Sequence, residues 1–292
     1  MKDEKIRRQT VAGSFYDASP TQLHKVIEDL IFTASIKKNG LPVQALIVPH
    51  AGYIFSGATA AATFKTALNC DYKRIAVIAP SHYHSLTGIA YSSFESYETP
   101  FGNLKVDSET IKKLMQKDMP WIQSGNSPHK EEHSLEVQLP FIRHIFGEIE
   151  ILPFVCGRVD DKIALSIAEV LLPFFNMETL WVISSDFTHY GTSFRYTPFK
   201  DDIRNKIKAL DMGAVDKIIE LDFEGFSDFI EKTRATICGC NPIKILLMMC
   251  HLANKGNAII IPELVDYTNS GELTGDYSHC VSYAGITFYR KV

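Results

Sequence analysis

Apolar runs alternate with amphipathic segments along most of this chain. A continuous run of valine, isoleucine and leucine is typical of a parallel strand that is covered on both faces. On this pattern we expect strands over 44–49, 74–79, 150–155 and 180–185, a shorter strand near 88–93, and two closing strands over 258–265 and 279–288. The strand pattern therefore indicates a protein built around a buried central sheet.

Between these runs, apolar residues recur at helical spacing. Ser19 and Pro20 are a favourable helix start, since serine caps the first turn and proline suits the first helical position. Pro140 is expected to kink or split the helix that contains it. Helices are expected over 19–37, from about 56, from 107, near 134–146, over 161–175, and through most of 199–254.

The alternation of strands and helices predicts an α/β fold. We expect a single domain over residues 1–292, with helices on both faces of a mostly parallel central sheet. The first strand–helix–strand unit, 44–79, also implies a parallel pair joined by a right-handed crossover.

The composition is that of a soluble globular protein. Of the 292 residues, 46% are hydrophobic and 22% are charged, and the formal net charge is −4. The chain has no basic stripe, so no nucleic-acid partner is expected. The charged N-terminus is followed by no apolar segment, which predicts a cytoplasmic protein that does not enter a membrane. The six cysteines are then expected to be reduced thiols or metal ligands.

Three of the predicted strand-like runs end on a histidine: His50, His82 and His189. In open α/β sheets the ligand crevice lies outside the carboxyl ends of the strands, so these imidazoles indicate one shared metal or acid/base site. His50 could instead satisfy a turn. His84, two residues after His82, is expected to be a solvated loop residue.

Asp186 precedes His189 by three residues at the end of the most apolar run. A carboxylate beside an imidazole can orient the ring and raise its basicity, which suits a general base or the support of a metal ligand. In the alternative, Asp186 caps the next segment and His189 is exposed.

His133 and Glu136 stand three residues apart at a predicted helix start. Positions i and i+3 share a helix face, so a joint supporting role at the site is expected for these two residues. Glu131 and Glu132 are expected to form an ordinary acidic helix start that complements the helix dipole.

Cys238 and Cys240 open a strongly apolar helix. A helix N-terminus lowers the pKa of a thiol, which suits a metal ligand or a nucleophile. In the alternative, both are small buried hydrophobic residues. The sequence has no phosphate-binding glycine loop, no G-x-S-x-G and no H-E-x-x-H, so nucleotide binding and serine-hydrolase chemistry are not expected.

Eight short motifs occur in an order that resembles the Memo family, which includes the eukaryotic mediator of cell motility and the prokaryotic AmmeMemoRadiSam system protein B. They are V-A-G-S-F-Y at 11–16, V-P-H-A-G-Y at 48–53, P-S-H at 80–82, T-P-F-G at 99–102, E-H-S-L-E at 132–136, S-S-D-F-T-H at 184–189, T-I-C-G at 236–239, and V-S-Y-A at 281–284. They span nearly the whole chain.

The resemblance implies a fold like that of the class III extradiol dioxygenases, which use non-haem iron. It also implies a metal site made of His50, His82 and Cys238, with Asp186 and His189 among the other polar residues of the cleft. Iron or copper is the expected metal, with zinc as the alternative.

The expected function is that of a metal-dependent redox protein with a dioxygenase-like cleft. His189, oriented by Asp186, would act as acid or base, with His133 in support. A second hypothesis is a non-catalytic peptide-binding or accessory protein that works with radical-SAM and AMMECR-type partners. A third is metal-assisted hydrolysis at a zinc site.

This chain has Cys240 and Asn241 where the animal protein of the family has arginine and histidine. The difference weakens the expectation of phosphopeptide binding. It also makes Cys240 a candidate extra ligand or redox partner of Cys238.

Overall fold

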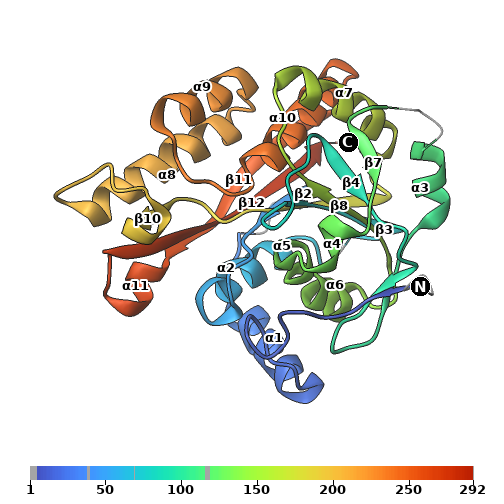
Figure 1. Cartoon of the computed structure of the whole chain (residues 1–292), viewed down its shortest axis with the longest axis horizontal. Coiled ribbons are helices and arrows are strands. Elements are labelled where there is room, and N and C mark those ends of the chain that lie inside the picture. Colours follow the sequence, from blue (N-terminus) through green and yellow to red (C-terminus); the bar gives the residue numbers. More distant parts are fainter. Residues whose placement is uncertain (1–4, 38–39, 69, 116–118, 292) are drawn as a thin grey trace.

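The computed structural model describes residues 5–37, 40–68, 70–115 and 119–291. Within these residues the main sheet has nine strands in the order β10-β12-β2-β9-β3-β8-β4-β7, with β11 paired to β12 (Figure 1). The strands of this sheet are β2 (Val43–Val48), β3 (Arg74–Pro80), β4 (Ile89–Tyr91), β7 (Ile122–Ser124), β8 (Glu150–Cys156), β9 (Thr179–Ser184), β10 (His189–Gly191), β11 (Ile259–Asn269) and β12 (His279–Lys291).

The centre of the sheet is parallel, and an antiparallel pairing joins it to the strands on either side. β2, β9, β3 and β8 run parallel, whereas β12 pairs antiparallel with β2 and β4 pairs antiparallel with β8. The α/β class is therefore confirmed, and the sheet as a whole is mixed. The expected pairing of β2 with β3 is wrong, because β9 is inserted between these two strands.

Helices cover both faces of the sheet (Figure 1). They are α1 (Pro20–Thr33), α2 (Tyr53–Lys65), α3 (Ser108–Met115), α4 (Ser127–Lys130), α5 (His133–Glu136), α6 (Gln138–Phe146), α7 (Asp161–Leu171), α8 (Ile203–Ile219), α9 (Phe223–Thr233), α10 (Cys240–Lys255) and α11 (Ser270–Thr274). On one face α10 contacts α7, α9 and the central strands, and on the other α2 contacts α1 and β2. No described helix is long and apolar enough to cross a membrane.

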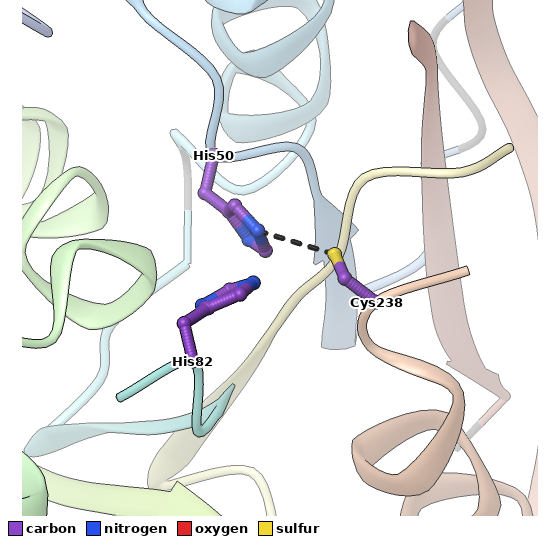
Figure 2. A group of neighbouring side chains, drawn as sticks. All are labelled: His50, His82 and Cys238. Carbon is purple, nitrogen blue, oxygen red and sulfur yellow. Dashed lines mark hydrogen bonds between the residues drawn. The ribbon is translucent and has the colours of Figure 1, made fainter. Parts of the chain in front are cut away.

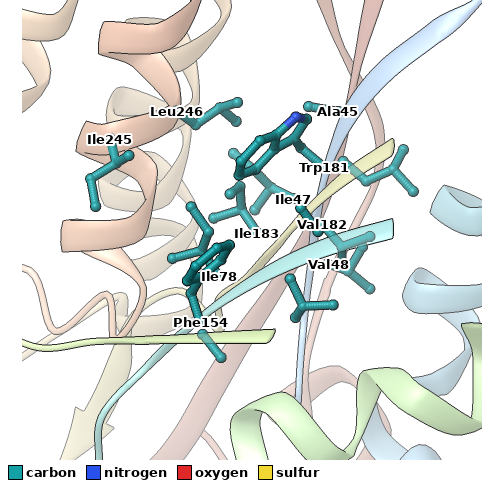
Figure 3. Packing of buried hydrophobic residues seen from close by; sticks show 14 of the residues in the cluster. Ala45, Ile47, Val48, Ile78, Phe154, Trp181, Val182, Ile183, Ile245 and Leu246 are labelled. Atoms are coloured by element: carbon teal, nitrogen blue, oxygen red, sulfur yellow. The ribbon is translucent and has the colours of Figure 1, made fainter. Parts of the chain in front are cut away.

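Burial of the central strands on both faces explains their apolar sequences. Every residue of β2 and β9 is buried, and Trp181 is fully enclosed. Figure 3 shows Trp181 and Ile183 of β9 beside Ile245 and Leu246 of α10. The sheet and α10 therefore share one apolar core, and the loops at the carboxyl ends of the strands project from it.

Several helix boundaries differ from the predicted ones, among them the end of α7, which is Leu171 and not residue 175. α1 has the predicted Ser19 cap but ends at Thr33, because Ala34 is extended. α2 begins at Tyr53, three residues before the predicted start. The helix expected over 134–146 is divided at Val137 into α5 and α6, and Pro140 lies in the first turn of α6, where its missing N–H needs no partner.

Three short strands form a separate small sheet. β1 (Ile6–Arg7) pairs parallel with β5 (Ser96–Tyr97), and β5 pairs antiparallel with β6 (Leu104–Lys105). This sheet brings the N-terminal segment alongside α5. The arrangement matters for the site, because α5 begins at His133.

Candidate metal centre

Three side chains from distant parts of the chain meet at the carboxyl edge of the sheet (Figure 2). His50 follows β2, His82 follows β3, and Cys238 precedes α10. One ligand atom from each lies within 4.8 Å of the other two, and Sγ of Cys238 is 3.2 Å from Nε2 of His50. The structure thus brings together the three residues that the resemblance implied.

The Ser184 hydroxyl holds His50 in one tautomer. It donates its single proton to the Ser134 carbonyl oxygen at 2.7 Å, and it accepts a hydrogen bond from the Gln138 side-chain amide at 2.9 Å. Its 2.8 Å contact with Nδ1 of His50 must then be donated by the imidazole. Nδ1 carries the proton, and Nε2 presents its lone pair toward Cys238.

Glu132 does the same for His82. Its carboxylate accepts hydrogen bonds from Nδ1 of His82 at 2.8 Å and from the backbone N–H of His82 at 2.7 Å. The Ser134 backbone N–H and hydroxyl also donate to it. Burial alone would raise the pKa of Glu132, but its hydrogen bonds with His82 hold the pKa below the usual value. Nε2 of His82 is therefore free to bind a ligand.

Glu132, like Ser184, is a site residue that the sequence prediction missed. It caps α5, as expected of an acidic helix start, but its buried carboxylate also orients a candidate metal ligand. Its place in the E-H-S-L-E motif, directly before His133, is the signal that could have singled it out.

His50 and His133 are neutral at neutral pH. Burial lowers the pKa of His50 well below its usual value, and the nearby His82, His133 and His189 lower it further. The pKa of His133 is lowered to about 4 by burial and by His82. Neutral imidazoles can serve as metal ligands, whereas protonated ones cannot.

The thiol of Cys238 is in a different environment from the one predicted. α10 begins at Cys240, so Cys238 lies two residues before the helix. Burial and the charge of Asp186 raise the pKa of this thiol well above its usual value, and the expectation of a lowered pKa is wrong. The sulfur accepts a hydrogen bond from the Asp186 backbone N–H at 3.2 Å.

Asp186 and His189 do not form the predicted pair. Asp186 accepts the backbone N–H of His50 at 2.7 Å, and its other carboxylate oxygen lies 4.0 Å from Nε2 of His50. The ring of His189 is oriented instead by two carbonyl oxygens, those of Phe187 and Thr236, at 2.9 and 3.1 Å from Nδ1. A spacing of three residues therefore does not bring these two side chains into a hydrogen bond with each other.

His133 reaches the site and Glu136 does not. The ring of His133 lies 4.5 Å from that of His82, measured between centroids, and its Nδ1 is 3.1 Å from the Tyr83 hydroxyl. The carboxylate of Glu136 instead binds residues of the N-terminal segment: Arg7, Thr10, Val11 and Tyr16. The predicted joint role of His133 and Glu136 is therefore wrong.

Two further predictions concern neighbouring residues. His84 is an exposed loop residue, as expected. Cys240 is not among the three residues whose ligand atoms converge, and burial raises the pKa of its thiol. All six cysteines are free, as predicted for reduced thiols.

The fold and the site define an α/β protein with a candidate centre of two imidazoles and one thiol at the carboxyl edge of its sheet. The chain belongs to the Memo family, since the model of the family described as Memo-like protein matches residues 7–287.

Relatives from distant organisms match almost the whole chain. A MEMO1 family protein of Thermoplasma volcanium is 32% identical over 98% of this chain and 100% of its own length. The memo-1 homolog of Caenorhabditis elegans is 31% identical over 98% of this chain and 83% of its own. The crystal structure of an uncharacterized protein from Escherichia coli K12 is a distant match, with a TM-score of 0.46 and 13% identity. The match covers 83% of this chain and 98% of that protein's chain.

Proposed function

We propose that this protein binds one redox-active metal ion, iron or copper, through Nε2 of His50, Nε2 of His82 and Sγ of Cys238. The observation that carries the proposal is the pair of imidazoles whose Nδ1 atoms are both committed to protein acceptors. In metal sites the second ring nitrogen is held in this way, which fixes the tautomer and directs the other nitrogen to the metal.

The raised pKa of Cys238 is consistent with this role. A buried thiol without a metal stays protonated and is a poor nucleophile. A bound cation deprotonates a coordinating thiol outright, so metal binding would reverse the effect of burial. Cys238 therefore fits a metal ligand better than a free catalytic nucleophile.

A bound iron or copper ion would supply electron transfer and open coordination positions for a small ligand, because three protein ligand atoms converge here. The protein would supply proton acceptors beside it. His133 is neutral at neutral pH and partly exposed, and it contacts the ring of His82. With Nδ1 of His189 turned toward two carbonyl oxygens, its Nε2 is left as the proton acceptor.

The test is metal content, measured by mass spectrometry on protein purified anaerobically. The wild type is expected to carry one iron or copper per chain, and Cys238→Ala is expected to lose it while keeping its circular dichroism spectrum. Cys240→Ala is the matched control, since this second thiol lies outside the cluster and should leave the metal in place.

His82→Ala and His84→Ala form a second matched pair, because His84 is an exposed loop histidine two residues away. Metal retained in folded Cys238→Ala and His82→Ala would disprove the ligand set. A wild type without metal, even after reconstitution with Fe(II) or Cu(I), would instead favour a non-catalytic binding or accessory protein. Loaded protein would next be screened for O₂ uptake with small aromatic substrates.

A further inference from the structure

A second group of metal-binding side chains lies outside the candidate centre, between α1 and α6. His24 and Glu28 come from α1, and His144 comes from the last turn of α6. One ligand atom from each of these three residues lies within 4.8 Å of the other two. None of the three belongs to the motifs on which the family resemblance rests.

The helix geometry brings these side chains together. His24 and Glu28 are four residues apart, so they lie one above the other on the same face of α1. Nε2 of His144 is 2.6 Å from the Glu28 carboxylate, and the rings of His24 and His144 have centroids 4.9 Å apart. Two imidazoles thus converge on one carboxylate from two helices.

The surroundings hold one ligand firmly and leave the others adjustable. The His144 side chain is only 9% exposed and lies against Phe101, with ring centroids 5.6 Å apart. The Glu28 side chain is 58% exposed. A fixed imidazole with exposed partners at the protein surface allows a cation to enter from solvent and the other two ligands to adjust around it.

We propose that His24, Glu28 and His144 bind a zinc-type divalent cation. Two imidazoles and one carboxylate are a common zinc ligand set, with water in the fourth position. Bonds of about 2.0–2.1 Å in a tetrahedral site place ligand atoms about 3.3 Å apart. The three ligand atoms here lie within 4.8 Å of one another, and the exposed Glu28 and His24 side chains would rotate to bring them to that spacing.

Bound zinc at this position would join the N-terminal helix to the rest of the fold. It would connect α1 to α6, the helix that continues from the His133 segment after Val137. Because the ion binds the folded chain and not the unfolded one, it would raise the melting temperature. At a free zinc concentration about 100 times the Kd, the shift is expected to be on the order of 5 °C for a chain of this size.

The test counts zinc bound per chain by equilibrium dialysis of the metal-free protein against Zn²⁺. Zinc binding at this peripheral site does not depend on the centre at Cys238. Four proteins, the wild type and three variants, distinguish zinc bound at one site from zinc bound at the other. Two zinc ions are expected for the wild type, one for His24→Ala, one for Cys238→Ala, and none for the double variant. His24 is exposed and alanine is a strong helix former, so His24→Ala is expected to fold.

His251→Ala is the control, since it removes another exposed helical histidine that is not in the group. His251→Ala should bind two zinc ions and keep the zinc-dependent rise in melting temperature. In the Cys238→Ala background, adding His24→Ala should abolish that rise. Equal zinc binding by His24→Ala and the wild type would overturn the proposal. If Cys238→Ala binds one zinc ion and the double variant Cys238→Ala/His24→Ala binds none, the proposal is supported, whatever is bound at the centre near His50.

Discussion

The Ser184 hydroxyl contacts three groups at the candidate centre, and its single proton can satisfy them in only one way. It donates to the Ser134 carbonyl oxygen and accepts hydrogen bonds from Gln138 and from Nδ1 of His50. One hydroxyl therefore determines the protonated nitrogen of a candidate ligand. At the scale of single residues, the proposed metal binding would therefore depend on side chains that do not themselves bind the metal.

Replacing Ser184 with alanine should weaken metal binding without removing a ligand. His50 would lose the acceptor that fixes its tautomer, and changes of this kind typically reduce metal affinity about 10- to 100-fold. The unpaired Ser134 carbonyl and His50 N–H should also cost about 1–3 kcal/mol of stability. Competition with a chelator measures the affinity, and chemical denaturation measures the stability.

Ser92→Ala is the control for this variant. Ser92 is also buried and its hydroxyl bonds Tyr97, away from the candidate centre. It should lose stability but keep the metal affinity of the wild type. The tautomer argument fails if Ser184→Ala binds the metal as tightly as Ser92→Ala does.

The position of Cys238 is set by the element after it, because the start of α10 packs directly on the end of β9. A Cβ at Gly239 would lie 2.3 Å from Cβ of Ser185 and 2.7 Å from the Ser184 carbonyl oxygen. The Gly239 N–H also donates to the Ser185 hydroxyl at 3.1 Å. Only glycine lets the chain approach the strand so closely.

Gly239→Ala should therefore move the segment that carries Cys238. Overpacking of this kind typically costs about 1–3 kcal/mol, and displacement of the sulfur should also weaken metal binding. Thermal unfolding and metal content of the same samples measure both effects. Gly125→Ala is the control, since its added Cβ would meet only ordinary contact with Pro128 at 3.5 Å. Normal metal content in Gly239→Ala would contradict this view of the α10 start.

The ends of the elements were harder to predict than their interiors. The strands β2, β3, β8 and β9 lie within a residue or two of their predicted ranges, because each has a mainly apolar centre that is buried on both faces. The end of α1 was not predicted, and the split expected at Pro140 falls at Val137 instead. Both boundaries depend on packing against neighbouring elements, which the periodicity of one segment does not contain.

At the scale of the whole molecule, Glu136 joins the N-terminal segment to the rest of the fold. Its carboxylate is only 1% exposed and pairs with Arg7, whose guanidinium also donates to the carbonyl oxygens of His129 and Glu132. Burial alone would raise the pKa of Glu136, but Arg7 and the hydrogen bonds from Tyr16 and the Val11 N–H hold it below the usual 4.5.

The lowered pKa of Glu136 has a defined effect on acid stability. The unfolded state binds this proton at a higher pH than the folded state, so the stabilisation is fully present above pH 4.5 and is lost as the pH falls through the folded pKa. Glu136→Gln should cost about 3–5 kcal/mol at pH 7, since it leaves Arg7 buried without its partner. As the pH is lowered from about 5, the free energy of unfolding of Glu136→Gln should also fall less than that of the wild type.

Denaturation at a series of pH values measures this effect. Glu95→Gln is the control, because its ion pair with Lys5 is largely exposed and should contribute little. If Glu136→Gln and the wild type lose the same stability on acidification, another group is responsible.

The sequence by itself determined the α/β class and the convergence of His50 and His82 on one sheet edge. Apolar runs can be buried only inside a layered fold, and parallel strands bring the residues after their carboxyl ends to a common edge. The tertiary structure decided which side chains face one another there. Glu132 rather than Glu136 orients the site, and Asp186 turns to His50 rather than His189. Such choices depend on loop paths and on competing hydrogen-bond partners from distant segments, which the spacing along one segment does not encode.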